Sequence, residues 1–343
     1  MAVITFKPKQ VTKRLLTAVP DRARDILEKR FALASDTEKM TLEAIGNMYG
    51  VTRERVRQVE NFALNSIRKS DIFESESTSF EELERLVHSL GGVVAEEDLL
   101  SHISPNRELQ NHITFLLVLG NFFTRQKEDS HLKHRWIVNT ELAKKVEDAL
   151  KKLNKSISHD DLIAEEDMLL MFKKHLKDAV DMYSDEEVIR RWLSLSKTIG
   201  RNPLGEWGIA ASPNINARGM RDYAFLVIRR HGSPMHFTEV AKEIGKVFNK
   251  TAHVATCHNE LIKDDRFVLV GRGLYALSEW GYQGGIVKDV IKAVLEKEGP
   301  MTKEQIIERV LKERYVKENT VIVNLQDRTC FKKDDGGYYC LAK

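Results

Sequence analysis

Apolar side chains recur at helical spacing through most of the first 70 residues of the chain. Pro20 separates two of the predicted helices, and Thr41 and Thr52 stand where a side-chain oxygen can cap the start of a helix. Gly50 can end the third helix in a left-handed conformation. The pattern predicts four helices, over residues 10–19, 21–33, 42–49 and 53–69.

The stretch DIFESESTS, residues 71–79, differs from the segment before it. It is polar and has no helical or strand period, which is typical of a loop. We therefore predict a linker over 71–79 that separates an N-terminal domain, residues 1–70, from the rest of the chain.

One order of predicted elements recurs four times beyond this linker. Each copy has three helices followed by two apolar strands joined by a turn, with a period of roughly 60–70 residues. In the last copy, Asp335 and Gly336 stand at the turn of the predicted hairpin. We interpret each copy as a winged helix and place the copies at residues 80–140, 141–212 (the most divergent), 217–282 and 285–343.

Four positions between residues 42 and 59 meet the packing demands of a helix-turn-helix. Gly46 is small where the two helices meet, and Gly50 lies in the tight turn, where glycine adopts a positive φ freely. Val56 and Val59 are apolar and are expected to pack back onto the first helix. The predicted fold is thus mainly α, with a helix-turn-helix head followed by about four winged-helix units of three helices and a β-hairpin each.

The second helix of this motif has a polar outer face near its start. Charged and amide side chains lie opposite the apolar side, namely Arg53, Glu54, Arg57, Gln58 and Asn61. Arginine suits guanine, an amide side chain suits adenine, and glutamate accepts from the amino group of cytosine. Because the first turns of a recognition helix enter the major groove, we predict binding to double-stranded DNA. The alternative is a solvated helix face with ion pairs one turn apart.

Composition and charge limit the classes of function. The 343 residues carry a net charge of +3, but residues 1–70 hold 14 Lys and Arg against 8 Asp and Glu, a net +6, which leaves −3 for the remainder. A basic segment of this kind suits a phosphate backbone. The chain has three cysteines and no CxxC pair, no apolar run long enough for a membrane span and no secretory signal. We expect a cytoplasmic, nucleoid-associated protein without a metal site, a cofactor or a membrane.

The head resembles a known family over residues 10–70. TLEAIGNMYGVTRERVRQVENFALNSIRK closely resembles region 4 of housekeeping-type bacterial sigma factors, and PDRARDILEKRFAL resembles the first half of that region. The resemblance implies reading of a −35 promoter element by Thr52, Arg53, Glu54, Arg55, Arg57 and Gln58. It also implies docking on the β flap of RNA polymerase, in a part of the head where docking and core residues cannot be separated by sequence. That part holds Leu15, Leu16, Ile26, Phe31 and Leu33.

The match also differs from a complete sigma factor. The family's region 2, which melts the −10 element, precedes region 4, whereas only nine residues precede the match in this sequence. We therefore expect that the chain does not initiate transcription alone.

A second resemblance covers about residues 217–282. HGSPMHFTEVAKEI and ATCHNELIKDDRFVLVGRGLYALSEWG resemble the HARE-HTH winged helix, a family that includes the N-terminal domain of the RNA polymerase δ subunit and domains fused to restriction and chromatin proteins. The Val270–Leu274 stretch contains GxG but is followed by a strand, so we interpret it as a wing turn and not as a phosphate loop. Arg272 in that turn is a candidate phosphate contact.

The sequence gives little support for a metal site or for enzymatic catalysis. His253, Cys257 and His258 are too few ligands on one element for a metal site, and His258 also fits the HARE-HTH pattern. Acidic runs at 96–98 and 165–167 fall at helix starts, where carboxylates favour the helix dipole. No GxSxG, Cys/His or Walker motif is present, so we do not expect an enzyme.

Three hypotheses remain open from the sequence. The leading one is a bacterial transcription factor that binds promoter-like DNA and RNA polymerase. The second is a protein–protein adaptor on RNA polymerase whose helix-turn-helix reads no bases. The third is the DNA-recognition component of a restriction or defence system.

Overall fold

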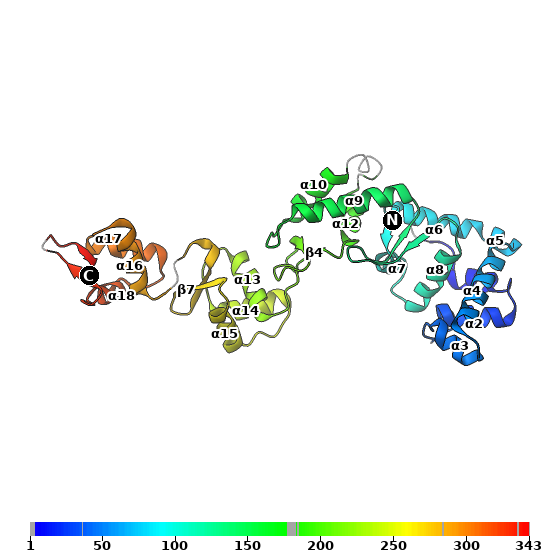
Figure 1. The fold of residues 1–343 in the computed structure, drawn as a ribbon, viewed down its shortest axis with the longest axis horizontal. Helices are drawn as coiled ribbons and strands as arrows, with labels where there is room; N and C mark the ends of the chain where they lie inside the picture. Colours follow the sequence, from blue (N-terminus) through cyan, green and yellow to red (C-terminus); the bar gives the residue numbers. More distant parts are fainter. Residues whose placement is uncertain are drawn as a thin grey trace. The chain divides into compact units, whose positions relative to one another are not determined.

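The protein is mainly helical, with four small antiparallel sheets among its described residues (Figure 1). The computed structural model describes residues 4–35, 37–176, 183, 185–282, 285–334 and 336–342. The chain divides into two compact units, Met1–Gly200 with Trp207–Ala210 and Arg201–Glu206 with Ala211–Lys343. The predicted fold class is confirmed as far as its mainly helical character.

The head has the four helices that the pattern predicts. They are α1 (Pro8–Leu16), α2 (Asp21–Phe31), α3 (Leu42–Tyr49) and α4 (Arg53–Arg68). The Thr41 hydroxyl accepts a hydrogen bond from the Ala44 N–H at 3.1 Å, so it caps α3 as predicted. Helix α2 ends where Ala32 adopts a left-handed conformation, φ 52°. The predicted bounds differ from the structure in the first two helices: α1 begins at Pro8 and the chain leaves it at Thr17, and α2 ends at Phe31 and not at Leu33.

The predicted linker at 71–79 is wrong, since this stretch is helical. Helix α5 (Asp71–Ser75) is followed by α6 (Ser77–Ser89) without an extended connection. Ser70 caps α5 by accepting from the Phe73 N–H at 3.3 Å, and Ile72 and Phe73 pack against the core of the head. Glu76 is buried and pairs with Arg14 of α1. Apolar contacts and this ion pair therefore hold the polar stretch against the head.

Residues 80–138 complete a three-stranded sheet. The order of elements after α6 is β1 (Val93–Ala95), α7 (Glu96–Ile103), α8 (Arg107–Leu119), β2 (Thr124–Gln126) and β3 (Arg135–Ile137). Strand β3 lies in the middle, antiparallel to both neighbours, with Trp136 opposite Val94 and Arg125. The hydrophobic pattern predicts the three helices and the hairpin, but it missed the short strand β1.

The two faces of this sheet belong to two different cores. Val94 and Trp136 face a core that also contains residues of α1, α2, α4, α6 and α8. Val93 and Ile137 face a second core, formed with the helices that follow. The head and residues 77–138 therefore share one continuous core, and the predicted domain boundary between them does not separate two independent bodies.

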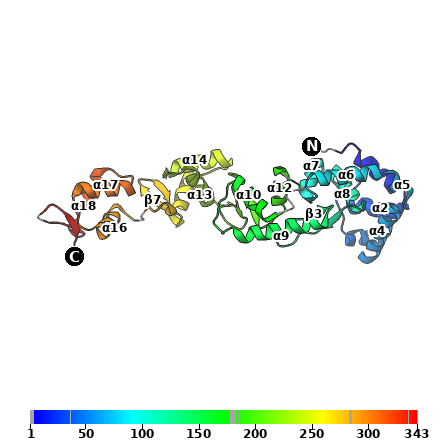
Figure 2. The same ribbon diagram turned by 90° about the horizontal axis from the view of Figure 1, so that it is seen from above.

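The third segment has three helices and a strand pair among its described residues. These are α9 (Thr140–Ser156), α10 (Glu165–Leu176), α12 (Glu186–Ser194), β4 (Ile199–Arg201) and β5 (Trp207–Ile209). Helix α9 lies along α10, as Figures 1 and 2 both show. Arg135 of β3 is almost fully buried and donates to Glu147 of α9 at 2.6 and 2.9 Å, which joins this segment to the preceding sheet.

The second unit contains two further helix-and-hairpin segments. The first has α13 (Met220–His231), β6 (Met235–His236), α14 (Phe237–Phe248), α15 (Val254–Lys263), β7 (Phe267–Gly271), β8 (Leu274–Leu277) and the 3-10 turn η1 (Ser278–Trp280). The second has α16 (Val287–Glu298), α17 (Lys303–Glu313), α18 (Glu318–Leu325), β9 (Phe331–Lys333) and β10 (Tyr339–Leu341). The predicted turn at Asp335 lies outside the described residues. The element orders agree with the predicted repeat, while the assignment to winged helices and to HARE-HTH stays a prediction.

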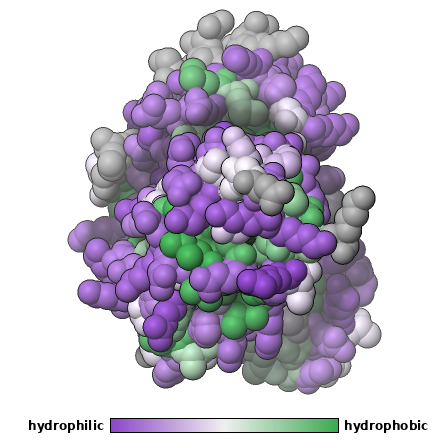
Figure 3. Space-filling view, turned by 90° about the vertical axis from the view of Figure 1, so that its left-hand side faces the viewer, coloured by the Kyte–Doolittle hydropathy of each residue, from purple (hydrophilic) through white to green (hydrophobic). Residues whose placement is uncertain are grey.

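The two segments of this unit meet at the edge of β7. The Tyr315 N–H donates to the Val270 carbonyl at 2.9 Å, and the Arg314 guanidinium donates to the Leu269 carbonyl. Figure 3, with the C-terminal segment toward the viewer, shows hydrophobic groups within a mostly hydrophilic surface. Exposed apolar side chains of this segment include Leu311, Val323 and Tyr338.

Candidate nucleic-acid interface

Helix α4 is anchored by its apolar side. Val56 is fully buried in a small cluster with Ile26 and Ile45, and Val59 packs against the same cluster. Ala63 and Ile67, further along the helix, are buried in the larger core of the head. These anchors fix the rotation of the helix about its axis, so the residues between them must face outward.

The turn before α4 depends on two glycines for different reasons. A Cβ on Gly46 would lie 2.6 Å from the carbonyl oxygen of Val51, so any side chain there collides with the backbone of the turn. Gly50 has open space around it but adopts φ +63°, a conformation that L residues other than asparagine avoid. Both anchor positions that the sequence predicts therefore have a physical cause in the structure.

The residues predicted to read DNA lie together on the outer face of α4 and at its N-cap. All seven are exposed: Thr52, Arg53, Glu54, Arg55, Arg57, Gln58 and Asn61. Thr52 also caps the helix, since its hydroxyl accepts from the Arg55 N–H at 3.2 Å. The described residues leave this strip open to a partner.

Two pairs of side chains organise the strip. Arg57 donates from Nε and Nη2 to the two carboxylate oxygens of Glu54, at 2.8 and 2.7 Å. Arg55 donates to Oε1 of Gln58 at 3.2 Å. The hydrogen bond from Arg57 lowers the pKa of Glu54 and raises the pKa of Arg57, so both stay charged around neutral pH. The strip therefore offers guanidinium donors, an amide and a fixed carboxylate within two helical turns.

Sequence reasoning missed two exposed apolar side chains of the head. Met48 on α3 is 58% exposed and Phe62 on α4 is 62% exposed. Phe62 follows Asn61 directly and lies outside the i, i+3 positions that form the buried side, a departure that the sequence alone could have revealed. Both side chains add apolar contact area next to the polar strip.

Arg272 lies at a different place in the molecule. It is exposed in the turn between β7 and β8, where Gly273 adopts φ +72°. The structure thus has the hairpin turn that the GxG stretch predicts and no helix N-terminus behind it. Arg272 and the α4 strip belong to different compact units.

The residues expected in the polymerase-docking part of the head belong to its core. All five are buried: Leu15, Leu16, Ile26, Phe31 and Leu33. Helix α8 covers the end of α2, because the ring of Phe115 packs edge-on against Phe31 and the Asn111 amide donates to the Ala32 carbonyl at 3.1 Å. Arg68, at the end of α4, donates to the Val118 and Leu119 carbonyls of α8 at 2.7 and 3.0 Å.

Most of helix α8 is buried. It follows α7 as α4 follows α3, yet its own residues from Asn111 to Leu117 and Leu119 are buried, and its exposed or half-buried part is mainly the first turn, Arg107–Gln110. The corresponding helix of the 217–282 segment, α15, is exposed over most of its first turns, Val254–Thr256. In the 80–140 segment, the helix that precedes the hairpin, α8, thus packs into the hydrophobic core.

Cys257 and His258, considered for a metal site or a nucleophile, are buried or packed against aromatic rings, as expected of structural residues. No group of three or more His, Cys, Asp or Glu in the described part of the chain is arranged to hold a metal ion. Cys257 is buried, and burial raises the pKa of its thiol to about 11, so the thiolate is scarce at neutral pH. The ring of His258 stacks on Phe237 with centroids 4.3 Å apart. None of the helices among the described residues has the length and apolar character that a membrane crossing requires.

Comparison with known proteins gives a family match to the head and a partial match to a sigma factor. Residues 15–69 match the family Sigma-70, region 4. A stretch of 72 residues is 43% identical to the RNA polymerase sigma factor RpoS of Coxiella burnetii, which covers 21% of this chain and 20% of that relative. The chain thus spans about a fifth of the length of this relative. The predicted resemblance of the head is confirmed: residues 15–69 are similar to Sigma-70, region 4, across both helices of the helix-turn-helix.

Proposed function

We propose that the protein is a bacterial DNA-binding transcription factor that reads a −35-type promoter element in the major groove with α4. One observation carries the proposal: the seven polar residues at the start of α4 are all exposed, on a helix whose opposite side is buried. The likeness of residues 15–69 to Sigma-70, region 4, supports the same reading of the helix. The protein acts by binding and not as an enzyme, in the cytoplasm at the nucleoid.

The side chains divide into two roles. Arg57, Gln58 and Asn61 supply the donors that suit guanine and adenine edges, and Glu54 accepts from cytosine. Arg53 shares the base-reading role, and the other Lys and Arg side chains around the strip supply phosphate contacts, which add affinity that falls with rising salt. Arg272 adds a phosphate contact from the second unit.

RNA polymerase is the proposed protein partner, since the relative that is similar over 72 residues is an RNA polymerase sigma factor. The β flap is the docking site that the sequence resemblance implies. Because Phe31 and the apolar residues around it are buried in the core, a flap contact would use other, exposed residues of the head. We do not propose promoter melting, because the exposed polar side chains of α4 account only for binding to duplex DNA.

An adaptor role is the second candidate. The packing of α8 into the core supports this candidate, because most of that helix makes contacts within the protein. In an adaptor, α4 would likewise serve a protein partner. A pull-down with RNA polymerase, with and without duplex DNA, separates the two functions, because an adaptor retains polymerase equally well in both.

Selection of bound duplexes from a random pool tests the DNA-reading function. The wild type should enrich a short motif, an R57A/Q58A variant should lose it, and an R85A control should keep it, because Arg85 is an exposed arginine on α6 away from the strip. A wild-type chain that enriches no motif would overturn the proposal.

A further inference from the structure

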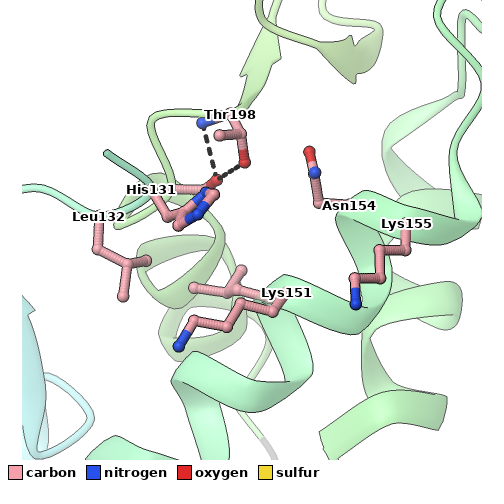
Figure 4. A pocket seen from close by; sticks show the side chains of 8 residues that line it. His131, Leu132, Lys151, Asn154, Lys155 and Thr198 are labelled. Carbon is pink, nitrogen blue, oxygen red and sulfur yellow. Dashed lines mark hydrogen bonds between the residues drawn. The ribbon is translucent and has the colours of Figure 1, made fainter. Parts of the chain in front are cut away.

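A cavity of about 230 Å³ lies in the first unit, away from α4 (Figure 4). Its walls come from the second half of α9, the connection between β2 and β3, and the chain just before β4. Buried leucines form its apolar side. The polar side chains that line it are His131, Lys151, Asn154, Lys155, Ser196 and Thr198.

The cavity has an excess of positive charge. Lys151 and Lys155 lie one turn apart on the same side of α9, both are exposed, and neither forms an ion pair among the described residues. No carboxylate is among the residues that line the cavity. Asp129, two residues before His131, has its Oδ1 occupied by the N–H groups of His131 and Leu132, at 2.7 and 2.8 Å. The two ammonium groups therefore face the solvent at the cavity without a counter-ion from the protein.

A chain of hydrogen bonds directs one hydroxyl proton outward. Ser196 Oγ accepts from the N–H groups of Thr198 and Ile199, at 3.1 and 3.0 Å, so both of its lone pairs are used. Ser196 must then donate its own proton to Thr198 Oγ1, which lies 3.2 Å away. The Thr198 hydroxyl proton remains to be donated to another acceptor, and Thr198 lines the cavity.

The side chain of Asn154 also lacks a partner at the cavity. Its Oδ1 is buried without a hydrogen-bond partner among the described residues. Figure 4 shows this amide extending from α9 beside Lys155. Because buried polar groups are nearly always paired, this unpaired acceptor indicates that a donor group is missing from the cavity.

We propose that this cavity binds a phosphoryl group. Two ammonium groups and a hydroxyl donor suit an anion with several acceptor oxygens, and Asn154 Oδ1 with the apolar side contributed by Leu132 and Leu150 suits a small attached organic group that carries a donor. The volume lies below the ~300–1,000 Å³ of pockets for drug-sized ligands, which favours a phosphoryl group with a small substituent. Such a group belongs either to a nucleic-acid backbone or to a free phosphorylated metabolite. The site does not depend on the reading of bases by α4.

Calorimetric titration of the full chain with inorganic pyrophosphate tests the site. We expect saturable binding that becomes weaker by about tenfold or more in a K151Q/K155Q variant, the effect of losing one charge-assisted hydrogen bond. A K144Q/K145Q variant removes the same charge from exposed positions of α9 that do not line the cavity, so its affinity should remain within about twofold of the wild type. Equal losses in the two variants, or no saturable binding by the wild type, would overturn the proposal.

Two further measurements sharpen the result. A T198V variant keeps the shape of the side chain but removes the hydroxyl, so it should weaken pyrophosphate binding while thermal unfolding stays within a few degrees. Unchanged pyrophosphate affinity in T198V would contradict the hydrogen-bond chain described above. Competition with a random-sequence duplex identifies the source: displacement of pyrophosphate indicates a nucleic-acid backbone, and retention indicates a free phosphorylated molecule.

Discussion

The ring of Phe31, at the end of α2, packs edge-on against the ring of Phe115 in α8, with centroids 5.3 Å apart and planes at 69°. This contact joins the helix-turn-helix head to the segment after it, inside a core to which both contribute. Aromatic pairs in this geometry add stabilisation beyond the burial of their surface. The head is therefore held by α8 as well as by its own helices.

Phe115→Ala should destabilise the head and the following segment together. The side chain is fully buried, so its removal should cost about 3–5 kcal/mol of unfolding free energy. Hydrogen exchange of the full chain should show amides of α4 and α8 losing protection to the same extent. The exposed Phe122 provides the control, because Phe122→Ala should change little. Protection lost in α8 alone would show that the head folds independently.

Arg57→Ala should weaken binding to the selected DNA site by ~1–3 kcal/mol and relax the choice of base. Arg57 has to exchange its Glu54 partner for a base edge, so Glu54→Gln should change base preference more than it changes affinity for random DNA. Fluorescence anisotropy on the selected duplex and on a random duplex measures both effects. Equal losses on the two duplexes would count against base reading by Arg57.

Substitution of the two turn glycines should separate collision from backbone strain. Gly46→Ala should cost ~1–3 kcal/mol, because the new Cβ meets the Val51 carbonyl. Gly50→Ala should cost about 1 kcal/mol from its left-handed backbone alone. Gly50→Asn should recover much of that loss, since asparagine tolerates this conformation, whereas Gly46→Asn should not. Denaturant unfolding of the four variants provides the comparison.

His112 on α8 should make stability depend on mildly acidic pH. The side chain is 3% exposed, neither ring nitrogen has a hydrogen-bond partner among the described residues, and burial lowers its pKa. The unfolded chain therefore takes up the proton first, so stability is complete at neutral pH and falls as the pH drops below about 6.5. His112→Leu removes this titration. Unfolding measured between pH 7 and pH 5 should show a shallower decline for the variant, and parallel curves would exclude His112 as the cause.

Local signals in the sequence were enough to locate the head and its reading strip. The caps at Thr41 and Thr52 and the two glycines act over a few residues, so their pattern specifies α3, the turn and α4 directly. The apolar spacing from Val56 onward also fixes which side of α4 is exposed. DNA binding by that side stays a prediction.

Long-range packing limited the rest of the prediction. The stretch 71–79 appears polar, and only the tertiary contacts of Ile72 and Phe73 explain why it is helical. Strand β1 has three residues and gains its hydrogen bonds from β3, more than 40 positions later in the sequence. The apolar run FLLVL indicates burial of the second half of α8, since a helical stretch that is apolar on all sides is buried. The partner that buries it was not evident from that run.

Strand β3 limits how this protein can change during evolution. Trp136 serves the core of the head and Ile137 serves the core around α9, so neighbouring residues of one strand support two bodies. A deletion of one residue before β3 that shifted its register would exchange the two side chains between the cores. Genetic recombination with a breakpoint near residue 80 or 140 would cut through a shared interior. Exchange of a single segment within the first 200 residues should therefore destabilise its neighbours, although their repeated pattern suggests interchangeable modules.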